Sequence, residues 1–333
     1  MATIEILNLI SQQLNIYWGS FMFIFGIIGA VWNIFIFRHH TLRSSSYCAY
    51  LLFGSIASLI QISFSLSDRI IDGGFQIHWT AKSTVWCKVR NYVAQCASLN
   101  ALSCLVFSAI DRFFSTCDEI KWRRLNSVSV AKRVCLFTSL FWIILAIPTL
   151  IYPKSIQITS NQYACQNTSV IWGMIITFVF NLCCYGMFPW ILMSLFGFLT
   201  WKNLCQIRHR RIGHTSSTIQ TRKARIDDQL ASMLYLQIII CILSSIPFCT
   251  QSVYYSLTQT IDKSAYRQAQ EYLFLQIARL AFYFNYISMF YVNYLSSAIF
   301  RQISKEVLKN FFKRKEDLSR AVTMINHQEF NKQ

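Results

Sequence analysis

Seven stretches of the sequence are long, apolar and almost free of charge. Six of them contain no Asp, Glu, Lys or Arg, and the seventh contains only Arg279. A helix that crosses a bilayer needs about 20 apolar residues, whereas apolar runs in soluble proteins are shorter. The pattern therefore predicts an all-α membrane protein, a bundle of seven transmembrane helices. The runs are Ile16–Phe37, Tyr47–Leu66, Tyr92–Ile110, Val134–Tyr152, Val170–Trp201, Leu230–Ile261 and Tyr272–Phe300.

Composition and charge agree with this prediction. Hydrophobic residues make up 54% of the chain and charged residues 14%, where soluble domains carry about a quarter charged residues. The net charge of +17 could indicate nucleic acid or an anionic membrane surface as a partner. Because the basic residues lie between apolar spans, we expect lipid and not nucleic acid.

The basic residues also predict the orientation of the helices. Connectors on one side hold 23 Lys and Arg residues, and those on the other side hold five. The positive-inside rule then places the N-terminus outside and the C-terminus in the cytosol. We predict an extracellular segment over residues 1–15, a seven-helix membrane domain over 16–300 and a cytoplasmic segment over 301–333.

The cytoplasmic segment opens with an amphipathic pattern. Apolar residues recur at helical spacing, and basic residues occupy the other face. This arrangement predicts a short helix that lies on the anionic inner leaflet. The apolar residues are Phe300, Ile303, Val307, Leu308 and Phe311, and the basic ones are Arg301, Lys305, Lys309, Lys313 and Arg314.

The twelve cysteines divide between the two sides of the membrane. Cys87 and Cys165 fall on the outer side, and the other ten lie in spans or on the inner side. Disulfides persist in oxidising compartments, so we expect Cys87 and Cys165 to form a disulfide rather than remain two free thiols.

Several motifs carry a family resemblance. Cys87 is followed, after 24 intervening residues, by Arg112 in the sequence Ser-Ala-Ile-Asp-Arg-Phe, residues 108–113. The fourth, fifth and sixth spans contain prolines, and Phe-Arg-Gln opens the chain after the seventh. From Ile16 to Phe312 the chain resembles the rhodopsin-like family of G-protein-coupled receptors, in the divergent form found among invertebrates. The resemblance implies a plasma-membrane receptor that couples an extracellular ligand to heterotrimeric G proteins, without cofactor or enzymatic activity.

The resemblance also assigns roles at the cytoplasmic end. A helix rises 1.5 Å per residue, so the step from Cys87 to Arg112 spans about 37 Å, roughly the bilayer core and part of each interface. In the family, Asp111 would hold the Arg112 side chain, and Asp227, twenty residues before Pro247, would be a second acid for it. Alternatively, these are ordinary interfacial charges, Asp227 lying beside Asp228.

Some family residues are replaced. Ala30 stands at the usual Asn of the first span, and the second span has no acid. Ser245 replaces the aromatic residue before Pro247, Gly197 replaces the Tyr of the fifth span, and the seventh has no Asn-Pro pair. These departures argue against the family's sodium site and usual internal switches, but not against the topology, the disulfide or the role of Arg112.

The ligand is constrained mainly by what the spans lack. The third span has no acid, Ala94 standing where amine receptors carry Asp, and the seventh has no Lys for retinal. A buried amine needs a carboxylate, so a biogenic amine is disfavoured. Arg279 could meet a carboxylate or an amidated peptide end, or could instead reach the interface or pair with Glu271. A peptide or a small organic molecule would then also contact Arg90, Gln95, Asn181, Gln251 and Tyr283.

Other chemistry is sparse. Asn167-Thr168-Ser169 is a glycosylation sequon close to the fifth span. All six histidines lie outside the spans, so no intramembrane metal site is expected, and no hydrolase or nucleotide-binding motif occurs. The alternative function is a channel or transporter that does not use G proteins.

Overall fold

The structure, a computed structural model, describes residues 2–77, 82–117, 119–159, 162–212, 218–311 and 313. Of these, the side chains of residues 157–159, 162–164, 208, 210–212 and 218–227 are not described.

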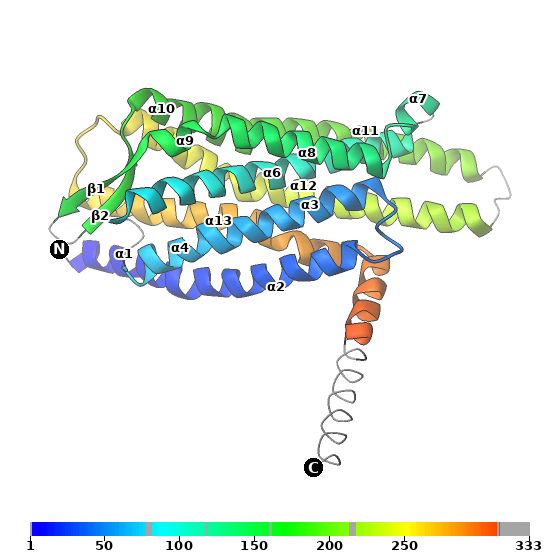
Figure 1. Ribbon diagram of the computed structural model, residues 1–333, viewed down its shortest axis with the longest axis horizontal. Coiled ribbons are helices and arrows are strands. Elements are labelled where there is room, and N and C mark those ends of the chain that lie inside the picture. The colour runs from blue at the N-terminus through cyan, green and yellow to red at the C-terminus, as the bar shows by residue number, and fades with distance from the viewer. Residues whose placement is uncertain are drawn as a thin grey trace, which may run out of the picture.

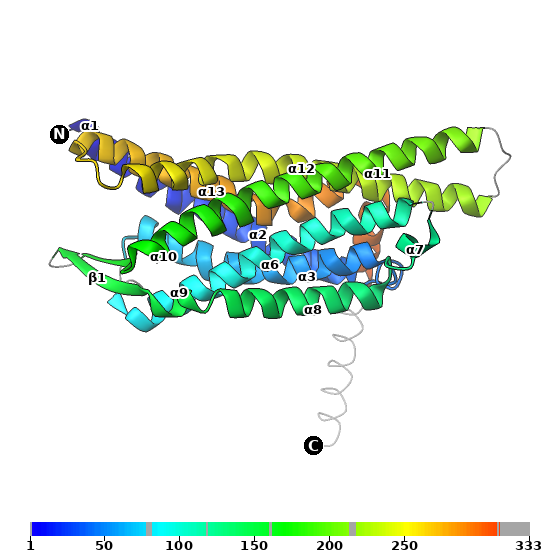
Figure 2. The same cartoon turned by 90° about the horizontal axis from the view of Figure 1, so that it is seen from above.

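The described part of the chain contains seven helices that are long and apolar enough to cross a membrane, which confirms the predicted seven-helix bundle. They run side by side along the length of the molecule (Figures 1 and 2). Most extend beyond their apolar run, because polar residues can continue a helix into the interface. The spans are Ala2–Phe37, Ser46–Gly74, Thr84–Thr116, Val128–Leu145, Val170–Ile207, Asp228–Thr258 and Ala265–Ser296.

Several spans join α-helical and wider, π-helical segments. The first consists of α1 (Ala2–Gln13), η1 (Leu14–Trp18) and α2 (Gly19–Phe37), and the second of α3 (Ser46–Gln61), η2 (Ile62–Leu66), α4 (Ser67–Arg69) and η3 (Ile70–Gly74). Next come α6 (Thr84–Thr116), α7 (Ile120–Arg123), α8 (Val128–Leu145) and α9 (Pro148–Ile151). The rest are α10 (Val170–Ile175), η4 (Ile176–Met187), α11 (Phe188–Ile212), α12 (Thr218–Thr258) and α13 (Ala265–Ser296).

Serine side chains mark the beginnings of four helices. Ser83, Ser127, Ser169 and Ser264 each accept a hydrogen bond, 3.3 Å long, from the backbone N–H three residues later. The first N–H groups of a helix have no partner within it, and a side-chain oxygen in this position satisfies one of them. These short polar residues therefore set where α6, α8, α10 and α13 begin.

The third and fourth spans differ most in their surroundings. In the most apolar part of each span, 67% of the residues of α6 are buried but only 11% of those of α8. The third span is thus the central helix of the bundle, and the fourth lies at its periphery. Exposed Phe137 on α8 and Phe198 on α11 face outward, as side chains in contact with lipid tails would.

A β-hairpin covers one end of the bundle. Strands β1 (Pro153–Thr159) and β2 (Gln162–Asn167) pair antiparallel, with Ser155 opposite Cys165. A disulfide joins Cys165 to Cys87 near the start of α6, with the Cα atoms 5.9 Å apart, as predicted. The bond holds the hairpin against the central helix at the end where α1 lies (Figure 1).

A further helix follows α13 at the opposite end. Residues 298–311 are helical and turn away from the bundle axis (Figure 1). Phe300 and Ile303 are buried, whereas Leu308 and Phe311 are exposed. Ser304 accepts a hydrogen bond of 3.0 Å from the Trp32 indole of α2. The predicted apolar stripe therefore begins against the bundle and ends on the surface.

Candidate functional site

A cavity of about 330 Å³ opens at the hairpin end of the bundle. It lies between the second, third, fifth, sixth and seventh spans, and Cys165 of the hairpin forms part of its wall. Ligand pockets in proteins range from about 300 to 1,000 Å³. Five of the six residues that the sequence proposed for a ligand line this cavity: Arg90, Gln95, Asn181, Arg279 and Tyr283.

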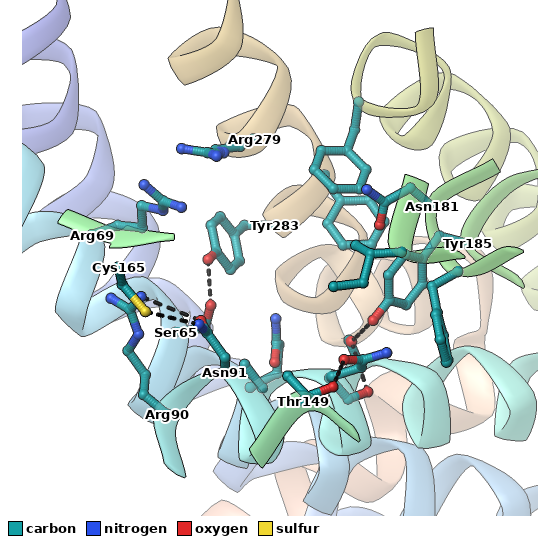
Figure 3. Close-up of a pocket in the computed structure, with 18 of the residues that line it drawn as sticks. Ser65, Arg69, Arg90, Asn91, Thr149, Cys165, Asn181, Tyr185, Arg279 and Tyr283 are labelled. Carbon is teal, nitrogen blue, oxygen red and sulfur yellow. Dashed lines mark hydrogen bonds between the residues drawn. The ribbon is translucent and has the colours of Figure 1, made fainter. Parts of the chain in front are cut away.

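One side of the cavity is basic. Arg69 comes from α4, Arg90 from α6 and Arg279 from α13, and the three side chains lie on the same side (Figure 3). Arg90 forms an ion pair with Asp68, which is buried. All three guanidinium groups line the same cavity, so their like charges repel one another. Three helices thus converge on a positively charged wall.

The opposite side is aromatic. Asn181 and Tyr185 of η4 face the arginines across the cavity (Figure 3). The ring of Phe282 stacks on that of Phe248 with centroids 4.6 Å apart, and its centroid is 5.3 Å from that of Tyr185. These rings come from the fifth, sixth and seventh spans, so packing between helices creates this apolar wall.

Hydrogen bonds between helices fix several lining side chains. The hydroxyl groups of Tyr283 and Ser65 are 2.5 Å apart, and those of Tyr185 and Ser98 are 2.7 Å apart. Gln95 accepts a bond of 2.6 Å from Thr149. Because each bond joins two different helices, the cavity wall is held in a defined shape.

Gln251 lies elsewhere. It lines a second cavity, of about 400 Å³, between the outer ends of α12 and α13. There Glu271 accepts bonds from Lys263 at 2.5 Å, from Arg267 at 3.0 Å and from Tyr254 at 2.7 Å. Glu271 is therefore occupied by this group, while Arg279 lines the first cavity.

Sequence reasoning did not include Arg69, Tyr185, Phe248 and Phe282 in the ligand site, although all four line it. Arg69 is one of the five basic residues that the sequence places in outer connectors, because the apolar run ends at Leu66. The helix in fact continues to Gly74, which turns Arg69 into a bundle residue. No signal in the sequence marked Arg69, because hydropathy does not show that a helix continues past its apolar run.

At the other end of the bundle, Asp111 and Arg112 of α6 are buried, with 4% and 5% of their surfaces exposed. Arg112 donates to an Asp111 oxygen at 3.3 Å, and Ser46 of α3 donates to the same oxygen at 2.9 Å. The Arg112 guanidinium carbon also lies 4.7 Å from the ring centre of Tyr47, a cation–π contact. The second span therefore holds both charged residues.

Asp227, the proposed second acid, lies in α12 among the residues whose side chains are not described. Whether it contacts Arg112 thus stays a prediction. Asn167 of β2 is exposed and lines the mouth of the first cavity. Glycosylation of Asn167 stays a prediction.

Polar contacts connect the fifth, sixth and seventh spans between the two ends. The Trp190 indole donates to Ser245 at 2.8 Å, and Gln237 donates to Asn293 at 2.8 Å. Ser245 is the residue that replaces the aromatic side chain before Pro247. The indole of Trp190, from the fifth span, lies next to it.

Comparison with known proteins identifies the class. A cavity at one end of seven helices, a disulfide to the central helix and a buried Asp-Arg at its other end are typical of a multi-pass membrane receptor. Residues 28–288 match the family described as 7 transmembrane receptor (rhodopsin family), and the chain belongs to this family.

One similar protein is G-protein coupled receptor 183 of Rattus norvegicus, with 23% identity over 141 residues. The match covers 41% of this chain and 38% of that receptor's length.

Proposed function

We propose that the protein is a plasma-membrane receptor that binds an extracellular ligand in the cavity beside the hairpin and activates heterotrimeric G proteins. The N-terminus would be extracellular and the C-terminus cytoplasmic. The observation that carries the proposal is the buried Asp111–Arg112 group at the opposite end of the same helix that lines the cavity.

The contacts of Arg112 support a resting state. A G protein could reach this side chain only after its contacts with Asp111 and Tyr47 had broken, because Arg112 is 5% exposed. Asp227 would act as a further partner in that state. A ligand that favours the open arrangement would shift the population towards it.

Membrane and partner assignments have separate support. The basic residues concentrate at the Arg112 end and in the helix over residues 298–311. Basic side chains at the cytoplasmic face bind anionic lipid, so we assign inner-leaflet lipid as a second partner. The replaced family residues at Ala30, Gly197 and Ser245 support a divergent invertebrate branch.

The test compares wild type with Arg112→Ala in membranes containing purified heterotrimeric G protein. Nucleotide exchange is measured with and without a panel of peptides and small organic acids, and surface expression is followed in parallel. We expect exchange in the wild type and none in Arg112→Ala at equal surface expression. Normal exchange by the variant, or ligand-gated current without exchange, would favour the channel or transporter alternative.

A further inference from the structure

The charge balance of the outer cavity indicates the class of ligand. Of the three arginines on its basic side, only Arg90 has a carboxylate partner in the described structure, namely Asp68. Within that described part, Arg69 and Arg279 make no hydrogen bond or ion pair. The described residues that line the cavity include no Asp or Glu to balance these two guanidinium groups.

Two segments of the chain next to α6 and around the disulfide contain no acid. Residues 75–83 precede α6, and residues 153–169 contain the hairpin and the sequon. Neither segment contains Asp or Glu. Glu271, the nearest acid along α13, is occupied by Lys263 and Arg267. An anion from outside the protein would therefore balance the positive charge of the cavity.

The arrangement of charged and aromatic side chains around the cavity limits the class of ligand further. Guanidinium groups bind carboxylate, sulfate and phosphate oxygens through paired hydrogen bonds. Opposite them lies Tyr185 (Figure 3), and the rings of Phe248 and Phe282 that pack with it also line the cavity, which gives an apolar surface. We infer that this cavity binds a small organic acid whose anionic head lies between Arg69 and Arg279 and whose apolar body packs on the aromatic wall. This inference rests on the proposed function only in taking the cavity as the receptor's ligand site.

The positions of these residues along α13 predict the same orientation of the ligand, with its anionic end outermost. On α13, Arg279 lies one turn nearer the hairpin end than Tyr283, and Phe282 lies deeper than Arg279. An anion would therefore stay near the mouth, where water reaches it, while the body enters the bundle. This order avoids the cost of placing a charge in the dry interior.

A small organic acid and the carboxyl end of a peptide both present a carboxylate next to an apolar group. A cavity of about 330 Å³ accommodates a small molecule or the last residue of a peptide, but not a folded chain. The experiment therefore contains an arm for each source.

Binding is measured on the purified full-length receptor in detergent, without G protein, by the rise in melting temperature with added probe. The probes are 4-phenylbutyrate, its amide, 4-phenylbutylamine and acetate, each up to tens of millimolar. N-acetylphenylalanine and its amide represent the peptide end. We expect stabilisation by one or both aromatic acids, less by acetate, and none by the amides or the amine.

Three variants test the assignment. Arg69→Gln and Arg279→Gln should each weaken binding of the acid at least about tenfold, since a charged partner has been removed. Arg267→Gln is the matched control: it removes the same charge from the outer end of α13, where the side chain is 45% exposed, and should leave binding unchanged. Asp68→Asn should strengthen binding a few-fold, because Arg90 loses its carboxylate.

Equal stabilisation by acid and amide, no stabilisation by any acid, or acid binding that survives both arginine substitutions would overturn the inference. A receptor that binds acids through these arginines but promotes no nucleotide exchange would leave the ligand class standing and refute G-protein coupling. Nucleotide exchange without acid binding would support G-protein coupling and refute the inferred ligand class.

Discussion

Tyr47 offers a quantitative test of how Arg112 is held. Tyr47 is fully buried, and its ring lies 4.7 Å from the Arg112 guanidinium carbon. A desolvated cation–π contact of this kind contributes about 2 kcal/mol. If the contact exists only in the resting state, Tyr47→Leu shifts the equilibrium towards the active state by up to roughly 30-fold. An active fraction of about 1% would rise to about a quarter.

The assay is basal nucleotide exchange on purified G protein, normalised to receptor number, without ligand. Two control variants distinguish the contact of the Tyr47 ring with Arg112 from the loss of its hydroxyl and from a general loss of packing. Tyr47→Phe keeps the ring and removes a hydroxyl that has no hydrogen-bond partner in the described structure, so exchange should stay low. Tyr50→Leu makes the same truncation at a buried residue of α3 whose ring pairs with Phe107, and should also stay low.

The reasoning fails if Tyr47→Leu gives no more exchange than Tyr50→Leu. It also fails if Tyr47→Phe raises exchange as much as Tyr47→Leu does, because the ring would then not be the group that holds Arg112.

Three further predictions concern the bundle. Cys87→Ser and Cys165→Ser should each reduce surface expression, since loss of a native disulfide costs about 2–5 kcal/mol, and the double variant should be no worse than either; additive losses would mean separate roles. Gly26→Ala should lower the melting temperature by overpacking worth about 1–3 kcal/mol, because its added methyl would lie 2.9 and 3.0 Å from side chains of two other spans. Gly173→Ala, with nothing within 4 Å, should not lower it. A tag at the N-terminus should stain on intact cells and one at the C-terminus only after permeabilisation; staining of neither end on intact cells would contradict the orientation.

The sequence alone was sufficient for features that depend on one segment at a time. Whether a stretch can cross a bilayer depends on its own length and apolarity, so the seven spans could be predicted. The Cys87–Cys165 disulfide followed from the side of the membrane on which each cysteine lies. The amphipathic pattern after Phe300 likewise needed only helical periodicity to predict a helix there.

The walls of the cavity depend on several segments together, and here the sequence was less informative. Arg69 joins the site because the second helix continues past its apolar run, so that this residue lines the same side of the cavity as Arg279 (Figure 3). Gln251 was expected there, but it lines a different cavity with Lys263 and Glu271, although Phe248, three residues earlier on α12, lines the first one. Depth along a helix is readable from sequence, whereas rotation about its axis is set by packing against neighbours.

The group around Asp111 and Arg112 likewise has a part that the sequence predicts and a part that only the tertiary structure reveals. The Asp-Arg pair and its distance from Cys87 were visible in the sequence, because both lie on one helix of regular rise. The contacts of Ser46 and Tyr47 with that pair were not, since they belong to a different helix. Only the tertiary structure brings the start of α3 against the end of α6, and thereby decides which side chains hold the buried arginine.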